Sequence, residues 1–133
     1  MVLVDTNVLL DVFTGDPQWA DWSQAQLDAA AVGDRLAINA VVYAELSIGF
    51  GRIEELDVVL ARTEIGLEEI PRAALFLAGK AFRRYKARGG TRTGVLPDFF
   101  IGAHAAVLAV PLLTRDSRSY ADYFPTIELI APA

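Results

Sequence analysis

Four carboxylates stand where a small sheet protein could use them for chemistry. They are Asp5, Glu45, Asp98 and Asp116. Asp5 and Asp116 come just past short apolar runs that predict strands, whereas Glu45 and Asp98 lie on or at predicted helices with apolar neighbours. Each acid alone has an ordinary explanation as a helix cap, a turn residue or a solvated side chain. Because the carboxyl ends of parallel strands converge, the four acids could instead share one small pocket.

Carboxylates crowded into such a pocket would resist ionising together. One or two divalent cations relieve that repulsion, and a set of oxygen ligands suits Mg²⁺ or Mn²⁺. Such a cation activates water and stabilises the leaving oxygen when a phosphodiester is cleaved. The four acids therefore favour a metal-dependent nuclease.

Positive charge is concentrated in one segment, although the chain is acidic overall, with 12 Lys and Arg against 17 Asp and Glu. The segment from Ile70 to Pro97 contains no acid and holds more than half of the basic residues. Lys80, Arg84 and Arg88 are spaced to form a stripe on one helix face, and Arg92 lies in the glycine-rich loop that follows. A solvated face is the ordinary explanation for such a stripe. Without interleaved acids the stripe would repel itself, which favours a polyanion such as RNA as partner.

The elements that must position these residues alternate between strands and helices. We expect a single α/β domain over residues 1–133, with a parallel sheet of four to five short strands and helices on both faces. Strands are predicted at 2–4, 36–38, 63–67, 112–114 and 127–130. Helices are predicted at 6–13, 18–32, 41–50, 52–62, 71–88, from Asp98 to before Pro111, and at 117–124. Asn39 is the expected N-cap of the helix that carries Glu45.

Composition indicates in which compartment this domain works and whether part of its surface is covered. The sequence has no cysteine, which fits a reducing compartment, and its longest apolar run is too short and too interrupted for a membrane span. We therefore expect a cytoplasmic protein. With 53% hydrophobic residues and a mean hydropathy of +0.34, we also expect an apolar surface covered by a partner or a second copy.

Four segments in order resemble one known family. VLVDTNVLLD, NAVVYAELSIGF, GVLPDFFIGAHA and LLTRDSRSYADYFPTIELI are similar to the successive acidic motifs of PIN-domain proteins, specifically VapC-type toxins of type II toxin–antitoxin systems. Each motif is short, but four in the right order over nearly the whole chain are specific.

The resemblance implies a Mg²⁺- or Mn²⁺-dependent endoribonuclease that forms a homodimer and is held inactive by a VapB-type antitoxin. Carried over residue by residue, Asp5, Glu45, Asp98 and Asp116 match the family's metal-binding acids. In the resulting hypothesis Asp5, Asp98 and Asp116 hold the metal, while Glu45 helps bind it or orients the attacking water. Thr6 and Asn7 match the polar positions that help orient the first acid.

Other functions fit the sequence less well. A phosphatase of the haloacid dehalogenase type needs a second Asp two positions after the first, where this chain has Asn7. A phospho-receiver domain has an acid pair ahead of the first strand's Asp and a well-placed lysine, and this chain lacks both. A nuclease that uses two histidines for acid–base catalysis is excluded, because the chain has a single histidine. A non-catalytic PIN-like module that binds RNA or an antitoxin remains the main alternative.

Overall fold

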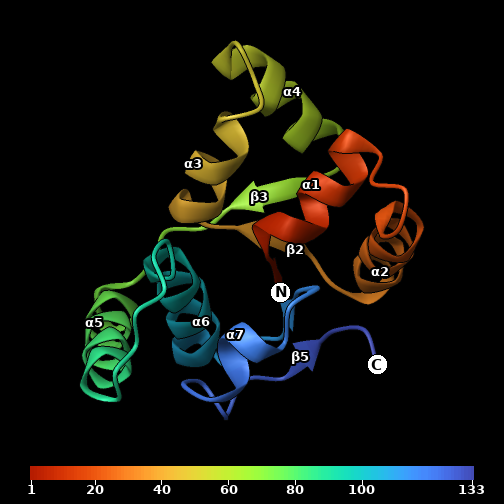
Figure 1. Ribbon diagram of the computed structural model, residues 1–133. Helices are drawn as coiled ribbons and strands as arrows, with labels where there is room; N and C mark the ends of the chain where they lie inside the picture. Colours follow the sequence, from red (N-terminus) through yellow and green to blue (C-terminus); the bar gives the residue numbers. More distant parts are fainter.

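A five-stranded parallel sheet forms the centre of the protein in a computed structural model that describes residues 1–133 (Figure 1). The strands are β1 (Val2–Val4), β2 (Leu36–Ile38), β3 (Ile65–Leu67), β4 (Leu112–Leu113) and β5 (Leu129–Ile130), in the order β3-β2-β1-β4-β5. Every neighbouring pair is parallel. The predicted α/β fold with a short parallel sheet is confirmed.

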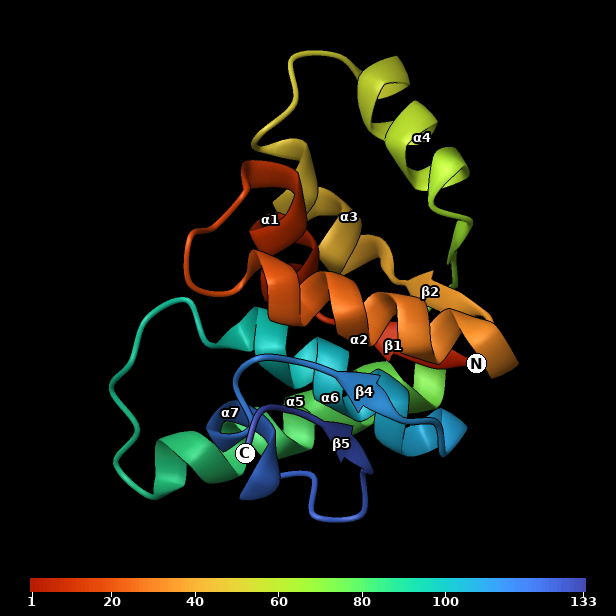
Figure 2. The same ribbon diagram turned by 90° about the vertical axis from the view of Figure 1, so that its right-hand side faces the viewer.

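Seven helices surround the sheet. They are α1 (Thr6–Thr14), α2 (Ala20–Gly33), α3 (Ala40–Ser47), α4 (Ile53–Arg62), α5 (Arg72–Ala87), α6 (Leu96–Leu108) and α7 (Arg118–Ala121). Helices α1 and α2 lie on one side of the sheet, and α5, α6 and α7 lie on the other (Figure 2). Helix α4 follows α3 and packs against α3 and against strand β3. No helix is long and apolar enough to cross a bilayer.

Local sequence accounts for several of these boundaries. Gly15 ends α1 in the left-handed conformation (φ 65°), which glycine adopts without steric cost. The side chain of Asn39 accepts hydrogen bonds from the backbone N–H groups of Val41 and Val42, both at 3.0 Å, so the predicted N-cap of α3 is confirmed.

The order of the strands determines where a site can form. Strand β1 is central: β2 and β3 extend from one of its edges, and β4 and β5 from the other. Successive strands are thus added first on one side of β1 and then, from β4 onward, on the other side. The point of reversal lies between the neighbouring strands β1 and β4. In parallel α/β sheets, ligands bind in the crevice beyond the carboxyl ends of the strands at such a reversal.

The core beneath that edge is dense and mostly aliphatic. A single cluster of 26 buried hydrophobic residues includes all of β1, β2 and β4. A second group of contacts is aromatic: the rings of Phe99 and Tyr123 lie 5.3 Å apart, and those of Tyr85 and Phe99 lie 5.7 Å apart. Tyr85, Phe99 and Tyr123 form this aromatic cluster, which packs α5, α6 and the segment after α7 against one another.

Candidate active site

The structure brings the four predicted acids to the carboxyl end of the sheet. Asp5 follows β1, Asp116 lies in the segment between β4 and α7, Glu45 is on α3, and Asp98 is in the first turn of α6. Figure 2 shows α1, the start of α6 and α7 at this same end of the molecule. The acids are close enough to influence one another, because the charges of Asp5, Glu45 and Asp116 all raise the pKa of Asp98.

Asp5 is the most enclosed of the four, with only 4% of its surface exposed. Its Oδ1 accepts the backbone N–H of Thr6 at 2.7 Å, so Asp5 also caps α1. Its Oδ2 accepts hydrogen bonds from Thr114 Oγ1 at 2.8 Å, Tyr120 Oη at 2.7 Å and Asn7 Nδ2 at 3.3 Å. Burial raises the pKa of Asp5, while these donors favour the ionised form and pull it back down.

Glu45 has one partner in the site. It is half-buried on α3, as its apolar neighbours predict, and its Oε1 accepts a hydrogen bond of 2.6 Å from Thr6 Oγ1. Thr6 thus contacts two acids, Asp5 through its backbone and Glu45 through its hydroxyl. This arrangement fixes the start of α1 against α3.

Asp98 differs from Asp5 because almost nothing in the protein bonds to it. The alternative that Asp98 caps its helix is wrong: α6 begins two residues earlier, at Leu96, and its first turn contains Pro97. Proline is tolerated there because the first helical N–H groups have no partner within the helix. The nearest donor to Asp98 Oδ1 is Tyr120 Oη, at 3.5 Å. Burial, followed by the charges of Asp5, Glu45 and Asp116, raises the pKa of Asp98 to about 6.

Asp116 is exposed and is held only by its own segment. Its Oδ2 accepts a hydrogen bond from Ser119 Oγ at 2.6 Å, and its backbone N–H donates to Thr114 Oγ1 at 3.0 Å. Asp116 itself occupies neither a turn nor a helix cap, since the bend is at Arg115 and Ser117 is the residue that precedes α7. Its side chain remains open to solvent beside the other three acids.

Four further residues form contacts that the sequence interpretation missed. Thr114 and Tyr120 donate to Asp5, and Asp11 forms an ion pair with Arg115 next to Asp116. Thr114 follows β4 as Asp5 follows β1, so the convergence of strand ends could have identified it. The sequence offers no comparable indication for Tyr120, because an aromatic residue in a short helix usually packs in the hydrophobic core. Its hydroxyl is completely buried, and its pKa is raised well above the usual value by burial and by Asp5 and Asp98.

The donor chemistry of the site fits a hard divalent cation. All four side chains offer oxygen, and the pKa of Asp98 is raised first by burial and then by the neighbouring negative charges, whose repulsion a cation would relieve. No group of three or more of these acids is close enough, as placed, to share one ion. Asp98 and Asp116 are partly solvated and make few bonds, so they are the acids freest to move toward one.

The basic stripe lies on exposed surface beside the site. Lys80, Arg84 and Arg88 are exposed on α5, and Arg92 is exposed in the loop before α6. Figure 2 shows the end of α5, this loop and the start of α6 on the side toward which β1 points. The Arg88 guanidinium lies 5.5 Å from the Tyr123 ring centre, and the Arg92 N–H donates to Tyr85 Oη at 2.7 Å. Arg88 and Arg92 therefore both contact the aromatic cluster.

His104 has a structural position, as the sequence interpretation assumed. It is buried on α6, and its Nδ1 lies 3.2 Å from Asn39 Nδ2. Burial lowers the pKa of His104, so the ring is neutral. A neutral Nδ1 accepts from the Asn39 amide, which links the start of α3 to α6 and hence the helices that carry Glu45 and Asp98.

Comparison with known proteins agrees with this architecture. A family model described as PIN domain matches residues 2–123. Among solved structures, VapBC2 from Rickettsia felis bound to a promoter DNA fragment has a TM-score of 0.75 at 21% identity, with 98% of each chain covered. VapBC-1 from nontypeable Haemophilus influenzae has a TM-score of 0.73 at 20% identity, again over 98% of each chain.

A further similar structure is VapBC-5 from Mycobacterium tuberculosis, with a TM-score of 0.59 at 24% identity over 98% of this chain and 97% of that one. No curated protein matches the sequence. At these identities the solved structures show a shared fold.

Proposed function

The chain belongs to the PIN-domain family, and we propose that it is a VapC-type toxin, a Mg²⁺- or Mn²⁺-dependent endoribonuclease neutralised by a VapB-type antitoxin. The observation that carries this proposal is the convergence of carboxylates at the carboxyl end of the sheet, where Thr6 contacts both Asp5 and Glu45 and the Tyr120 hydroxyl contacts both Asp5 and Asp98. In this proposal residues 1–133 act as one nuclease domain. Membership of the family sets aside the haloacid dehalogenase and phospho-receiver alternatives.

Asp5, Asp98 and Asp116 are the proposed metal ligands, directly or through water. A bound divalent cation would activate water for attack on phosphorus and stabilise charge on the leaving oxygen. Asn7, Thr114 and Tyr120 hold the Asp5 carboxylate in one orientation, which is the usual task of residues around a ligand. Thr6 holds Glu45, which helps bind the cation or orients the attacking water.

Hydrolysis of this kind leaves a 5′-phosphate and a 3′-hydroxyl, because water and not the ribose 2′-hydroxyl attacks. The single histidine is buried and neutral, so it takes no part in proton transfer to RNA. Lys80, Arg84, Arg88 and Arg92 would neutralise phosphates on the strand as it crosses the loop and reaches the acids.

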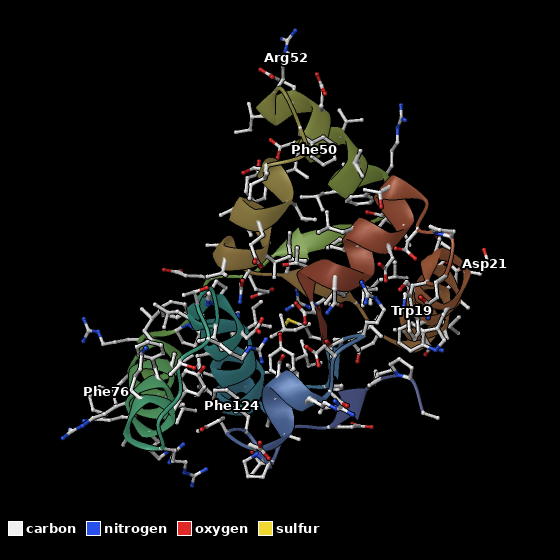
Figure 3. The ribbon with its side chains drawn as sticks, in the orientation of Figure 1. Trp19, Asp21, Phe50, Arg52, Phe76 and Phe124 are labelled. Carbon is white, nitrogen blue, oxygen red and sulfur yellow. The ribbon has the colours of Figure 1, made fainter.

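The proposed partners rest on what the similar structures are and on exposed apolar surface. VapBC complexes from three organisms share this fold over nearly the whole chain. Ile48, Ile53 and Phe76 are 87%, 63% and 68% exposed, and Phe76 points outward from α5 in Figure 3. Large exposed apolar side chains favour protein partners, here the antitoxin and a second copy of the chain.

The deciding experiment is cleavage of total RNA by purified protein with Mg²⁺, with Mn²⁺ and with EDTA. We expect metal-dependent cleavage with 5′-phosphate ends, and loss of cleavage in Asp98→Asn and Asp5→Asn. Asp21→Asn is the matched control, because Asp21 is exposed on α2 at the edge of the molecule (Figure 3) and should retain full activity. Folded protein that is free of antitoxin and inactive with every metal would favour the non-catalytic binding module.

A further inference from the structure

We propose that Asp11 and Arg115 form a clamp that positions the segment between β4 and α7, and with it Asp116, at the acid site. We call this pair the Asp11–Arg115 clamp. Neither residue is among the four acids or their direct hydrogen-bond partners. This inference rests on the proposed function for its consequence, but its geometry is independent of it.

The clamp is a two-pronged ion pair between a buried aspartate and a partly exposed arginine. Arg115 Nε lies 2.7 Å from Asp11 Oδ2, and one terminal nitrogen of Arg115 lies 3.0 Å from Asp11 Oδ1. Asp11 is 3% exposed and also accepts a hydrogen bond of 2.9 Å from Ser23 Oγ on α2. A charge buried this deeply is costly without its partner, so the pair is not an incidental surface contact.

Arg115 is held on a second side by an aromatic ring. Its guanidinium lies 5.4 Å from the ring centre of Trp19, which Figure 3 labels on the side of α1 and α2. Trp19 in turn makes an edge-to-face contact with Trp22. The planar arginine therefore has its charge paired with Asp11 and one face covered, which restricts it to one orientation.

The backbone of Arg115 connects the clamp to the acid site. Its N–H donates to Asn7 Oδ1 at 3.1 Å, while Asn7 Nδ2 donates to Asp5. The preceding residue, Thr114, donates to Asp5, and the following residue, Asp116, donates its N–H back to Thr114 Oγ1. Three consecutive residues thus share one network with Asp5.

Asp116 has no other anchor to the body of the protein. Its side chain is exposed and bonds only to Ser119, three residues along the same segment. Its position relative to Asp5 therefore depends on its neighbours Thr114 and Arg115. Because the Arg115 side chain contacts Asp11 on α1 and Trp19 just before α2, loss of the clamp should release Asp116 more than it disturbs Asp5.

Hydrogen exchange of the metal-free protein tests the clamp directly. The variants are Asp11→Asn, Arg115→Gln and the double variant, with Leu27→Ala as the control. Leu27 is buried on α2 and lines a cavity to which no residue of the segment contributes, so its truncation should lower stability without removing the ion pair. In the clamp variants we expect the Arg115 and Asp116 amides to exchange at least about tenfold faster relative to the Leu3 amide, which pairs within the sheet.

Metal affinity and kinetics test the consequence for the site. In both single variants we expect Mn²⁺ binding, measured by calorimetry, to weaken about tenfold, with a similar loss in kcat and an unchanged KM for RNA. The double variant should lose no more than the worse single variant, because both changes break one interaction. Leu27→Ala should lower Tm yet leave Mn²⁺ binding and kcat as in the wild type.

Unchanged exchange at Arg115 and Asp116 would overturn the clamp. Faster exchange with unchanged Mn²⁺ affinity would overturn the positioning role and leave a purely structural ion pair. A wild-type protein that neither binds Mn²⁺ nor cleaves RNA would overturn the proposed function instead, while the exchange data would still support or overturn the clamp itself.

Discussion

Asp5 and Asp98 face the same site from opposite sides, but the protein treats them differently. Asp5, on the sheet side, accepts four hydrogen bonds at 3.3 Å or less. Asp98, on the helix side, has only a Tyr120 hydroxyl at 3.5 Å. Burial raises the pKa of both; hydrogen bonds from Tyr120, Thr114 and the Thr6 backbone oppose this at Asp5, whereas only the Tyr120 hydroxyl opposes it at Asp98. The comparison shows one acid fixed in place by the fold and another that the protein leaves almost without hydrogen-bond partners.

The largest expected effect is an opposite change in the free energy of unfolding when each of the two acids is replaced by asparagine. Asp5→Asn should lower the free energy of unfolding by about 2 kcal/mol, because an amide cannot accept all the donors now aimed at the carboxylate. Asp98→Asn should instead raise it by about 1 kcal/mol at pH 7, since it removes repulsion from a partly solvated acid. Denaturant unfolding of the metal-free proteins measures both. Equal shifts in the two variants would remove the distinction between the two sides.

Tyr120→Phe should produce the next largest effect. It keeps the buried ring but removes the hydroxyl that donates to Asp5, so we expect a loss of about 1 kcal/mol. In the Asp5→Asn background the same change should cost less, which a double-mutant cycle would detect. Tyr123→Phe is the control, because the Tyr123 hydroxyl makes no hydrogen bond within the protein. A cycle with no coupling would mean that Tyr120 serves only the core.

The pH dependence of stability sharpens the comparison on the Asp98 side. The folded-state pKa of Asp98, about 6, lies above its usual 3.8, so folding favours the protonated acid. The stability that protonation supplies is complete below about pH 4 and is lost as pH rises through about 6. Wild type and Asp98→Asn should therefore be equally stable at pH 4 and differ by about 1 kcal/mol at pH 7.

Comparing these two proteins removes other titrations from the result. The pKa of His104 is lowered in the folded protein, so folding stability decreases as pH falls below its usual 6.5. This decrease is the same in both proteins and cancels in the comparison. Added Mg²⁺ at pH 7 should stabilise the wild type and not Asp98→Asn. A constant difference between the two proteins from pH 4 to 7 would contradict the assigned pKa.

The smallest effect on stability is expected for the basic stripe, which touches neither side of the site. Reversing Lys80, Arg84 and Arg88 to glutamate should leave the free energy of unfolding nearly unchanged but weaken RNA binding in EDTA. The slope of log affinity against log salt should flatten by about 0.7 for each lost phosphate contact. Reversal of Arg35, Arg52 and Arg62 gives the same charge change elsewhere. Equal slopes in the two triple variants would make the stripe a solvated face.

Much of the fold follows from local sequence. Short apolar runs that end at Asp5 or Asn39 identify strands, and Gly15 and Pro71 stand at helix boundaries because their backbones suit those positions. The start of α6 was misjudged, since Asp98 looks like a cap while Pro97 can occupy the first turn. A single side chain that favours a cap does not determine a boundary when a neighbouring residue permits an earlier one.

The candidate site was only partly predictable for a different reason. The four acids are recognisable because each stands beside an apolar element whose geometry places it. Thr114, Tyr120 and the Asp11–Arg115 clamp are not recognisable, because their role lies in side-chain contacts between residues about a hundred positions apart. Local periodicity contains no information about such contacts until the order of the strands is known.

The central place of β1 has a consequence for how the protein is made. Its two edges pair with β2 and with β4, and Leu3 lies opposite Leu112, so contacts of high sequence separation must close before the sheet is continuous. Such topologies fold slowly compared with helical domains. A nascent chain whose synthesis has not reached Thr114 lacks the neighbour that completes the environment of Asp5. The acid site would thus assemble only after the segment that contains Thr114 has been synthesised, later than the pairing of β1 with β2.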